Sequence, residues 1–351
     1  MPDYEDLYGL LESLILAPGV SGAEGPVRAV VAAELASRGV NAAFERDELG
    51  NCWVHLGPAG EPERLLVAHM DELGLRITSI REDGLCAVVN VGGIDPQLWE
   101  GTPVVVYTEA GVVPGAIAPV SLHVTTRQGH GPHERLKIAD LLLDLGARSA
   151  PEVAELGVKL LDPVTWPKRI DRLGGGLVQA RSLDDRFGCA TLIEAAGRLA
   201  SRQPPIPTVL AWSVQEEVGL RGARVLAGRF RQCREVIAVD SYTVGQGPRD
   251  NRQFDGPRPG GGPVLRCHDA TTLVPDELRL ELLSKAQSLG FDLQYGYMPG
   301  GNDASVFADS GARVLALGAC VQYSHSQAER CSLSDLARLS DLLTAWCGGN
   351  V

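Results

Sequence analysis

The sequence lacks the features of a membrane-spanning, secreted or nucleic-acid-binding protein. It contains no run of about 18 apolar residues, so we expect no transmembrane helix. Residues 1–6 are acidic and lack the apolar core of a signal peptide. Basic residues form no patch, and the net charge of −12 argues against nucleic acid or an anionic membrane as a partner. We therefore expect a cytoplasmic protein.

The sequence also lacks a cysteine motif. None of its eight cysteines forms a Cys-x-x-Cys pair, and they are scattered along the chain. A chain of 351 residues without a signal peptide is not typical of a disulfide scaffold. We expect the cysteines to be buried, reduced thiols and not metal ligands.

Most of the chain shows the alternation of strands and helices that is typical of an α/β domain. Helices are predicted over 3–16, 24–38, 186–201, 220–229, 275–289, 303–309 and 332–346. Strands are predicted over 41–46, 51–56, 207–214, 234–240, 291–297 and 313–318, and in the apolar run that begins at residue 64. Such alternation predicts a mostly parallel sheet with helices on both faces.

The segment 74–167 has a different pattern. Short β segments are predicted at 75–80, 85–91, 103–107 and 112–117, separated by turns rich in glycine and proline. Regular short strands of this kind favour a small barrel or sandwich. Residues 125–134 are polar and predict a loop. We therefore expect an α/β domain, 1–73 with 168–351, interrupted by a β domain, 74–167.

The residues Thr208–Leu220 combine a strand pattern with two adjacent carboxylates. The apolar, β-branched run is followed by Glu216 and Glu217. On an extended backbone, neighbouring side chains point to opposite faces, so one glutamate could hold a metal while the other reaches a different part of the same cavity. The carboxyl end of a buried strand is where open α/β sheets place their sites. The alternative is a solvated loop.

Other predicted strand ends carry side chains that can bind metals. They are His69 with Asp71, Asp184 with Asp185, Asp240 and His325. Histidine and carboxylate ligands without cysteine suit Zn, Co or Mn in a catalytic site. Each has another explanation, because an aspartate pair can cap the helix near Arg186, and the others can be loop residues. A metal explains the whole set, since buried carboxylates need compensating positive charge.

Six motifs together resemble those of the M42 aminopeptidases, the glutamyl and tetrahedral aminopeptidase group of the co-catalytic dizinc exopeptidases. The motifs are His69–Gly74, Leu183–Gly188, Val214–Gly219, Val239–Asp240, Pro299–Ala304 and Tyr323–Ser326. The resemblance extends over nearly the whole chain. It departs from the family at Asn302, where threonine is usual. His130 and His133 match no ligand of the family.

The resemblance implies a dizinc-aminopeptidase-like α/β fold with an inserted small β-barrel, and a centre of two divalent metal ions, Zn or Co. The implied ligands are Asp184 as the bridge, His69 and Asp240 at the first metal, and Glu217 and His325 at the second. Asp71 would orient His69 through a hydrogen bond. The implied substrate-binding residues are Gly300, Gly301 and Asn302.

The implied activity is removal of N-terminal residues from short peptides. A hydroxide that bridges the metals would attack the peptide carbonyl, with Glu216 as general base. The alternatives are an endoglucanase-type glycosidase that uses a pair of carboxylates, and a catalytically silent peptide-binding protein of the same fold.

The resemblance also implies a homo-oligomer, a dodecamer built from dimers with the inserted domain at its contacts. The apolar residues Ile94, Leu98, Trp99 and Val104 favour this arrangement, because they lie in a domain that is too small to bury much surface on its own.

Overall fold

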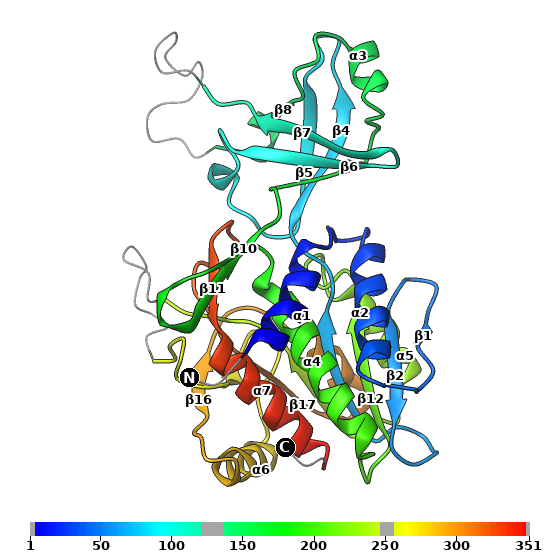
Figure 1. Ribbon diagram of the computed structural model, residues 1–351, viewed down its shortest axis with the longest axis vertical. Coiled ribbons are helices and arrows are strands. Elements are labelled where there is room, and N and C mark those ends of the chain that lie inside the picture. The colour runs from blue at the N-terminus through cyan, green and yellow to red at the C-terminus, as the bar shows by residue number, and fades with distance from the viewer. Residues whose placement is uncertain (1–3, 121–135, 246–255, 349–351) are drawn as a thin grey trace. The chain divides into compact units, whose positions relative to one another are not determined.

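The protein divides into two compact units (Figure 1). The structure is a computed structural model that describes residues 4–120, 136–245 and 256–348, so the predicted loop 125–134 lies outside the described residues. One unit comprises Met1–Asp71 and Arg169–Val351, and the other comprises Glu72–Lys168. Among the residues described, no helix has the length and apolar composition that a membrane span requires.

The larger unit is built on an eight-stranded sheet with the strand order β1-β2-β12-β3-β13-β17-β15-β16. Its strands are β1 (Glu45–Arg46), β2 (Cys52–Leu56), β3 (Arg64–His69), β12 (Thr208–Ser213), β13 (Glu235–Val239), β15 (Val264–His268), β16 (Gln294–Tyr297) and β17 (Arg313–Gly318). The four neighbours β12, β3, β13 and β17 are parallel, whereas β2 and β15 join this group antiparallel. The predicted mostly parallel sheet is confirmed, and the carboxyl ends of these four strands meet at one edge.

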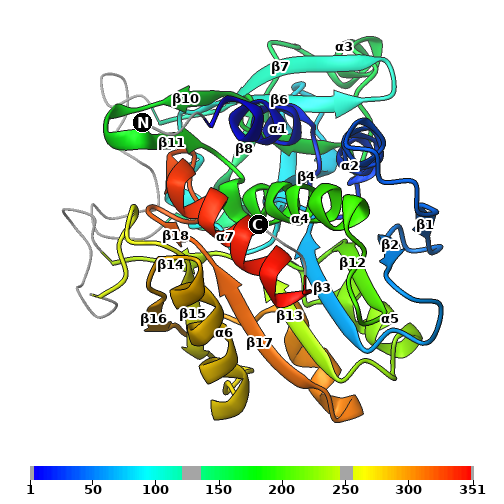
Figure 2. The same ribbon diagram turned by 60° about the horizontal axis from the view of Figure 1, so that its bottom comes forward.

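Helices cover both faces of this sheet. Successive side chains of a strand point to opposite faces, and in the buried strands the side chains on both faces are apolar. In β3, Leu66 and Ala68 pack with helices α1, α2, α4, α6 and α7, whereas Leu65 and Val67 pack on the opposite face with α5 and η5. Figure 2 shows α4 and α7 in front of the sheet. The bounds are α1 (Glu5–Leu16), α2 (Gly25–Ser37), α4 (Leu183–Ser201), α5 (Arg221–Arg229), α6 (Asp276–Ser288), η5 (Asp303–Ser310) and α7 (Leu333–Trp346).

Some boundaries differ from the predictions. The strand predicted over 207–214 ends at Ser213, and Gln215 has a φ of 57°, in the left-handed region that ends an extended strand. Glu216 and Glu217 therefore lie in the following loop and not on the strand. The strand predicted over 291–297 begins only at Gln294, and the helix predicted over 303–309 is a 3₁₀ helix.

Two small sheets in the same unit join distant parts of the chain. One has the order β10-β11-β19, and the other pairs β14 with β18. The bounds are β10 (Ile170–Arg172), β11 (Leu177–Ala180), β14 (Tyr242–Thr243), β18 (Cys320–Val321) and β19 (Glu329–Ser332), and the 3₁₀ turn η3 (Gly174–Gly176) joins β10 to β11. The first sheet thus places the segment before α4 beside the segment before α7.

The smaller unit is a closed barrel with the strand order β4-β5-β8-β7-β6-β9, which confirms the barrel. Its elements are β4 (Gly74–Ile80), β5 (Cys86–Val91), η1 (Pro96–Leu98), β6 (Pro103–Thr108), β7 (Gly111–Ile117), η2 (Ile138–Asp140), β8 (Leu142–Asp144), α3 (Ala150–Glu155) and β9 (Pro163–Thr165).

The barrel has a core of its own, in which Trp99 stacks on Trp166 with 3.8 Å between ring centroids. Ile94, Trp99 and Val104 belong to that core, whereas Leu98 is exposed. The expectation that this domain is too small to bury much surface on its own is therefore wrong for Ile94, Trp99 and Val104.

Gly318, at the end of β17, approaches the backbone of Asp240 so closely that a side chain has no room. A Cβ atom at this position would lie 1.7 Å from the carbonyl oxygen of Asp240. The end of β17 and the residue that follows β13 are thus packed backbone against backbone.

We predict that Gly318→Ala lowers the free energy of unfolding by roughly 1–3 kcal/mol or more, because the backbone must shift to admit the methyl group. Urea denaturation of the full chain measures this. Gly9→Ala in α1 is the control, since a Cβ there has nothing within 4 Å, and alanine should stabilise a helix interior by about 0.5–1 kcal/mol. Equal stabilities for Gly318→Ala and the unmodified protein would contradict the close approach.

Candidate metal centre

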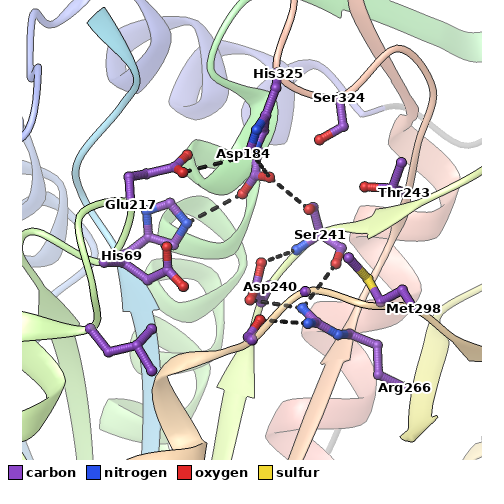
Figure 3. A pocket seen from close by; sticks show the side chains of 14 residues that line it. His69, Asp184, Glu217, Asp240, Ser241, Thr243, Arg266, Met298, Ser324 and His325 are labelled. Atoms are coloured by element: carbon purple, nitrogen blue, oxygen red, sulfur yellow. Dashed lines mark hydrogen bonds and ion pairs between the residues drawn. The ribbon is translucent and has the colours of Figure 1, made fainter. Parts of the chain in front are cut away.

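A cavity of about 470 Å³ opens at the carboxyl edge of the central strands. It brings together eight of the ten predicted site residues: His69, Asp184, Glu216, Glu217, Asp240, Gly300, Gly301 and His325. Leu220, Ser241, Thr243, Arg266, Met298 and Ser324 complete the lining. Figure 3 shows that the labelled histidines and carboxylates come from different segments and face one another.

The centre of the cavity is a cluster of three possible metal ligands, His69, Asp184 and Glu217. One ligand atom from each lies within 4.8 Å of the other two. His69 Nε2 is 3.2 Å from Asp184 Oδ1. His325 extends the cluster, since its Nε2 lies 3.7 Å from both Asp184 Oδ2 and Glu217 Oε2 (Figure 3). Imidazole and carboxylate donors in this arrangement suit a borderline divalent cation.

Asp71 lies behind the cavity and holds two parts of the site. Its Oδ1 is 3.4 Å from His69 Nδ1, so the ring presents Nε2 to the cavity. The same carboxylate accepts the backbone N–H groups of Glu216 at 2.9 Å and Glu217 at 3.2 Å, and the hydroxyl of Ser21 at 2.6 Å. Asp71 thus positions the glutamate pair as well as the histidine. The alternation of side chains along a strand does not set the positions of the two glutamates, because both follow the end of β12 and both line the cavity.

The adjacent aspartates at the start of α4 have different roles. Asp185 Oδ1 accepts the backbone N–H of Gly188 at 3.1 Å, and its Oδ2 accepts that of His69 at 3.2 Å. The helix-capping explanation therefore applies to Asp185. Asp184 faces the cavity instead, where its Oδ2 accepts the hydroxyl of Ser241 at 2.7 Å.

Arg266 on β15 is a buried residue of the site that the sequence reasoning missed. Its Nη1 donates to Asp240 Oδ2 at 2.8 Å, and its Nη2 donates to the carbonyl of Gly301 at 2.6 Å. Its Nη2 also lies 3.2 Å from Asp269 Oδ2. A buried guanidinium needs such partners. An arginine inside the apolar run of β15 was the available signal, but the run does not identify its partners.

Asn302 does not line the cavity, although it was predicted to bind substrate. Its side chain is fully buried, and Nδ2 donates to Asp269 Oδ2 at 2.7 Å and to Thr272 Oγ1 at 2.9 Å. Its Oδ1 accepts the backbone N–H of Ala304 at 2.9 Å and so caps η5. The side chain thus supports the loop, whereas Gly300 and Gly301 do line the cavity.

The cavity carries an excess of negative charge. Burial raises the pKa of Glu216 well above its ordinary value, and the carboxylates of Asp240 and Asp303 add to this effect. Burial and the neighbouring Asp184 likewise raise the pKa of Glu217. Burial also raises the pKa of Asp240, although Arg266 opposes the shift.

Asp184 and His69 stabilise each other's charged forms. Burial alone would raise the pKa of Asp184, but the hydrogen bond with His69 lowers it below its ordinary value. Burial alone would lower the pKa of His69, but hydrogen bonds with Asp184 and Asp71 raise it well above its usual range. His69 and Arg266 do not offset all of the surrounding carboxylates, and bound divalent cations would keep all of them ionised.

Residues 50–342 match the sequence pattern of the M42 glutamyl aminopeptidase family. This chain belongs to that family. It is therefore a metallo-aminopeptidase, a hydrolase, as the resemblance of its motifs implies.

Similar proteins agree with this membership. The chain is 30% identical to the glutamyl aminopeptidase of Lactococcus lactis subsp. cremoris over 97% of this chain and 95% of that protein. It is 35% identical to the TET1 peptidase of Pyrococcus horikoshii, which can assemble into a tetrahedron or a large octahedral shell, with a TM-score of 0.88 over 97% of this chain and 99% of that one. A further structure, the dodecamer of PhTET1-12s, is also 35% identical and has a TM-score of 0.87 over 99% of each chain.

Proposed function

We propose that this M42 aminopeptidase removes N-terminal residues from short peptides at a centre of two divalent metal ions. Asp184 would bridge the metals, with His69 and Asp240 completing one site and Glu217 and His325 the other. The convergence of His69, Asp184 and Glu217 within 4.8 Å carries this proposal. Asp240 accepts hydrogen bonds from Arg266 and from the backbone N–H of Ser241, and its carboxylate faces the cavity (Figure 3).

The bound cations, Zn or Co, would supply the charge that makes water acidic near neutral pH and polarises the peptide carbonyl. Glu216 is the side chain proposed to move the proton. It lines the cavity, is half-buried and has a raised pKa, which are properties of a general base. It accepts a proton from the attacking water as oxygen bonds to the carbonyl carbon, and it returns that proton to the amine as the C–N bond breaks.

We predict that Glu216→Gln retains both metals and loses roughly 10²–10⁴-fold in kcat, because the amide cannot accept the proton. Asp184→Ala should lose metal as well as activity, since the bridge would serve both ions. Metal content by atomic emission and hydrolysis of aminoacyl anilides measure the two effects. Near-normal turnover by Glu216→Gln would refute the role of Glu216.

The substrate is expected to have a free α-amine. We propose that the cations held by the proposed ligand residues would take up the lone pair of the neutral α-amine, which would restrict cleavage to the first peptide bond. The glycosidase alternative needs only a pair of carboxylates, and it gives no role to the histidines of the cluster.

We therefore predict that a peptide with a free N-terminus is shortened one residue at a time, whereas its N-acetylated form is not cleaved from that end. Mass spectrometry of the products of both peptides tests this. Internal cleavage of the acetylated peptide, or sugar release from a β-glucan, would overturn the exopeptidase proposal.

We also propose that the protein is a homo-oligomer, a dodecamer built from dimers, with the barrel at its contacts. The assembly of TET1 into a tetrahedron supports this by analogy. In the barrel unit, the apolar side chains of Val112, Leu160 and Leu161 are 57%, 55% and 64% exposed. Exposed apolar surface of this kind favours contact with another protein chain. A shell of this kind would admit short peptides and exclude folded proteins.

We predict that light scattering at micromolar concentration gives a mass close to that of twelve 37.3 kDa chains. Replacing Leu160 and Leu161 with aspartate should lower this mass, because buried charges oppose association. A monomeric mass for the unmodified protein would contradict assembly and would favour a lid function for the barrel.

A further inference from the structure

We infer that Glu329 is a positioning residue that sets the spacing between Asp184 and His325. This inference rests on the proposed metal centre, in which those two residues are ligands. Glu329 is the first residue of β19 and is buried, with 2% of its surface exposed. Its Oε2 accepts the backbone N–H of Asp184 at 3.2 Å, and its Oε1 accepts the backbone N–H of His325 at 2.7 Å. One carboxylate therefore links the main chains of two proposed ligands.

The pairing of two strands brings this carboxylate to its place. β11 and β19 are antiparallel, and Ala180 lies opposite Glu329 in their register. Asp184 follows β11 by only a few residues, so its backbone N–H comes within reach of the Glu329 side chain. His325 lies in the loop just before β19. The small sheet thus places the segments that carry Asp184 and His325 beside the carboxylate of Glu329.

The loop that carries His325 needs such support. Tyr323 and His325 have φ values of 55° and 61°, in the left-handed region that residues other than glycine seldom adopt. The hydrogen bond from the N–H of His325 to Glu329 opposes relaxation of this backbone. On the cavity side, His325 Nε2 lies 3.7 Å from Asp184 Oδ2. Fixing both main chains from behind keeps these two ligand atoms close together.

Only a carboxylate suits this position. Both neighbours are N–H donors, so both side-chain oxygens must accept. Glutamine has the same shape but offers one oxygen and one NH₂ group, and the NH₂ group would face an N–H donor. Glu329→Gln should therefore release one of the two ligand segments without changing the volume of the side chain.

Asp335 provides a matched control. This buried aspartate of α7 also accepts two backbone N–H groups, those of Gly262 at 2.8 Å and Gly260 at 2.7 Å. It does not line the cavity. Asp335→Asn should cost stability for the same reason as Glu329→Gln, but it leaves the proposed ligands in place.

The test titrates the metal-free full-length protein with Co²⁺ and follows visible absorption, alongside thermal unfolding without metal. We expect both variants to unfold at lower temperature than the unmodified protein. Only Glu329→Gln should lose affinity for Co²⁺, by about 10–100-fold, the range for residues that orient metal ligands. Glu329→Asp, which keeps two acceptor oxygens, should recover part of that loss and replaces Glu329→Gln if the latter does not fold.

A Co²⁺ affinity of Glu329→Gln equal to that of the unmodified protein would overturn the inference and leave Glu329 a purely structural residue. Failure of the unmodified protein to bind Co²⁺ would refute the proposed metal centre itself, so the two failures are distinguishable. Loss of Co²⁺ affinity in Asp335→Asn as large as that in Glu329→Gln would also overturn the inference, because general destabilisation would then explain both.

Discussion

Repulsion between carboxylates gathered at one edge of a sheet is the constraint on which this site depends. Asp184, Glu217 and Asp240 are buried or nearly so, and Asp184 raises the free energy of ionising Glu217 and Asp240. A fold tolerates such a cluster only where something supplies positive charge. His69 and Arg266 supply part of it. The remaining negative charge makes the cavity a place for cations.

Hydrogen bonds outside the cavity hold the site residues in place against this repulsion. Asp71 binds the backbone of the glutamate pair, Arg266 holds Asp240 beside the carbonyl of Gly301, and Asp185 fixes the start of α4 against His69. Most of these contacts use backbone N–H groups or a neighbouring side chain and leave the cavity free. The geometry is therefore set by the protein, and binding a metal need not reorganise it.

The sequence predicted the parts of the site that depend on local pattern. Strand ends at one edge of a parallel sheet follow from hydrophobic periodicity, and they placed His69 and Asp240 together, whereas Asp184 follows β11 of a separate antiparallel sheet. It could not identify Arg266 as the partner of Asp240, or explain the positions of Glu216 and Glu217, because both depend on contacts between distant segments. Nor could it show that the side chain of Asn302 turns inward to Asp269, whereas the neighbouring Gly300 and Gly301 line the cavity.

The interruption of the larger unit by the barrel has a consequence for synthesis on the ribosome. β3 emerges early, but its neighbours in the sheet, β12 and β13, follow only after the whole barrel has been made. Contacts of such long sequence separation form late. His325 follows β17 in the chain, so a chain that stops before this residue lacks part of the cavity lining. The cavity at the carboxyl edge is therefore completed only after all eight strands of the sheet have been made.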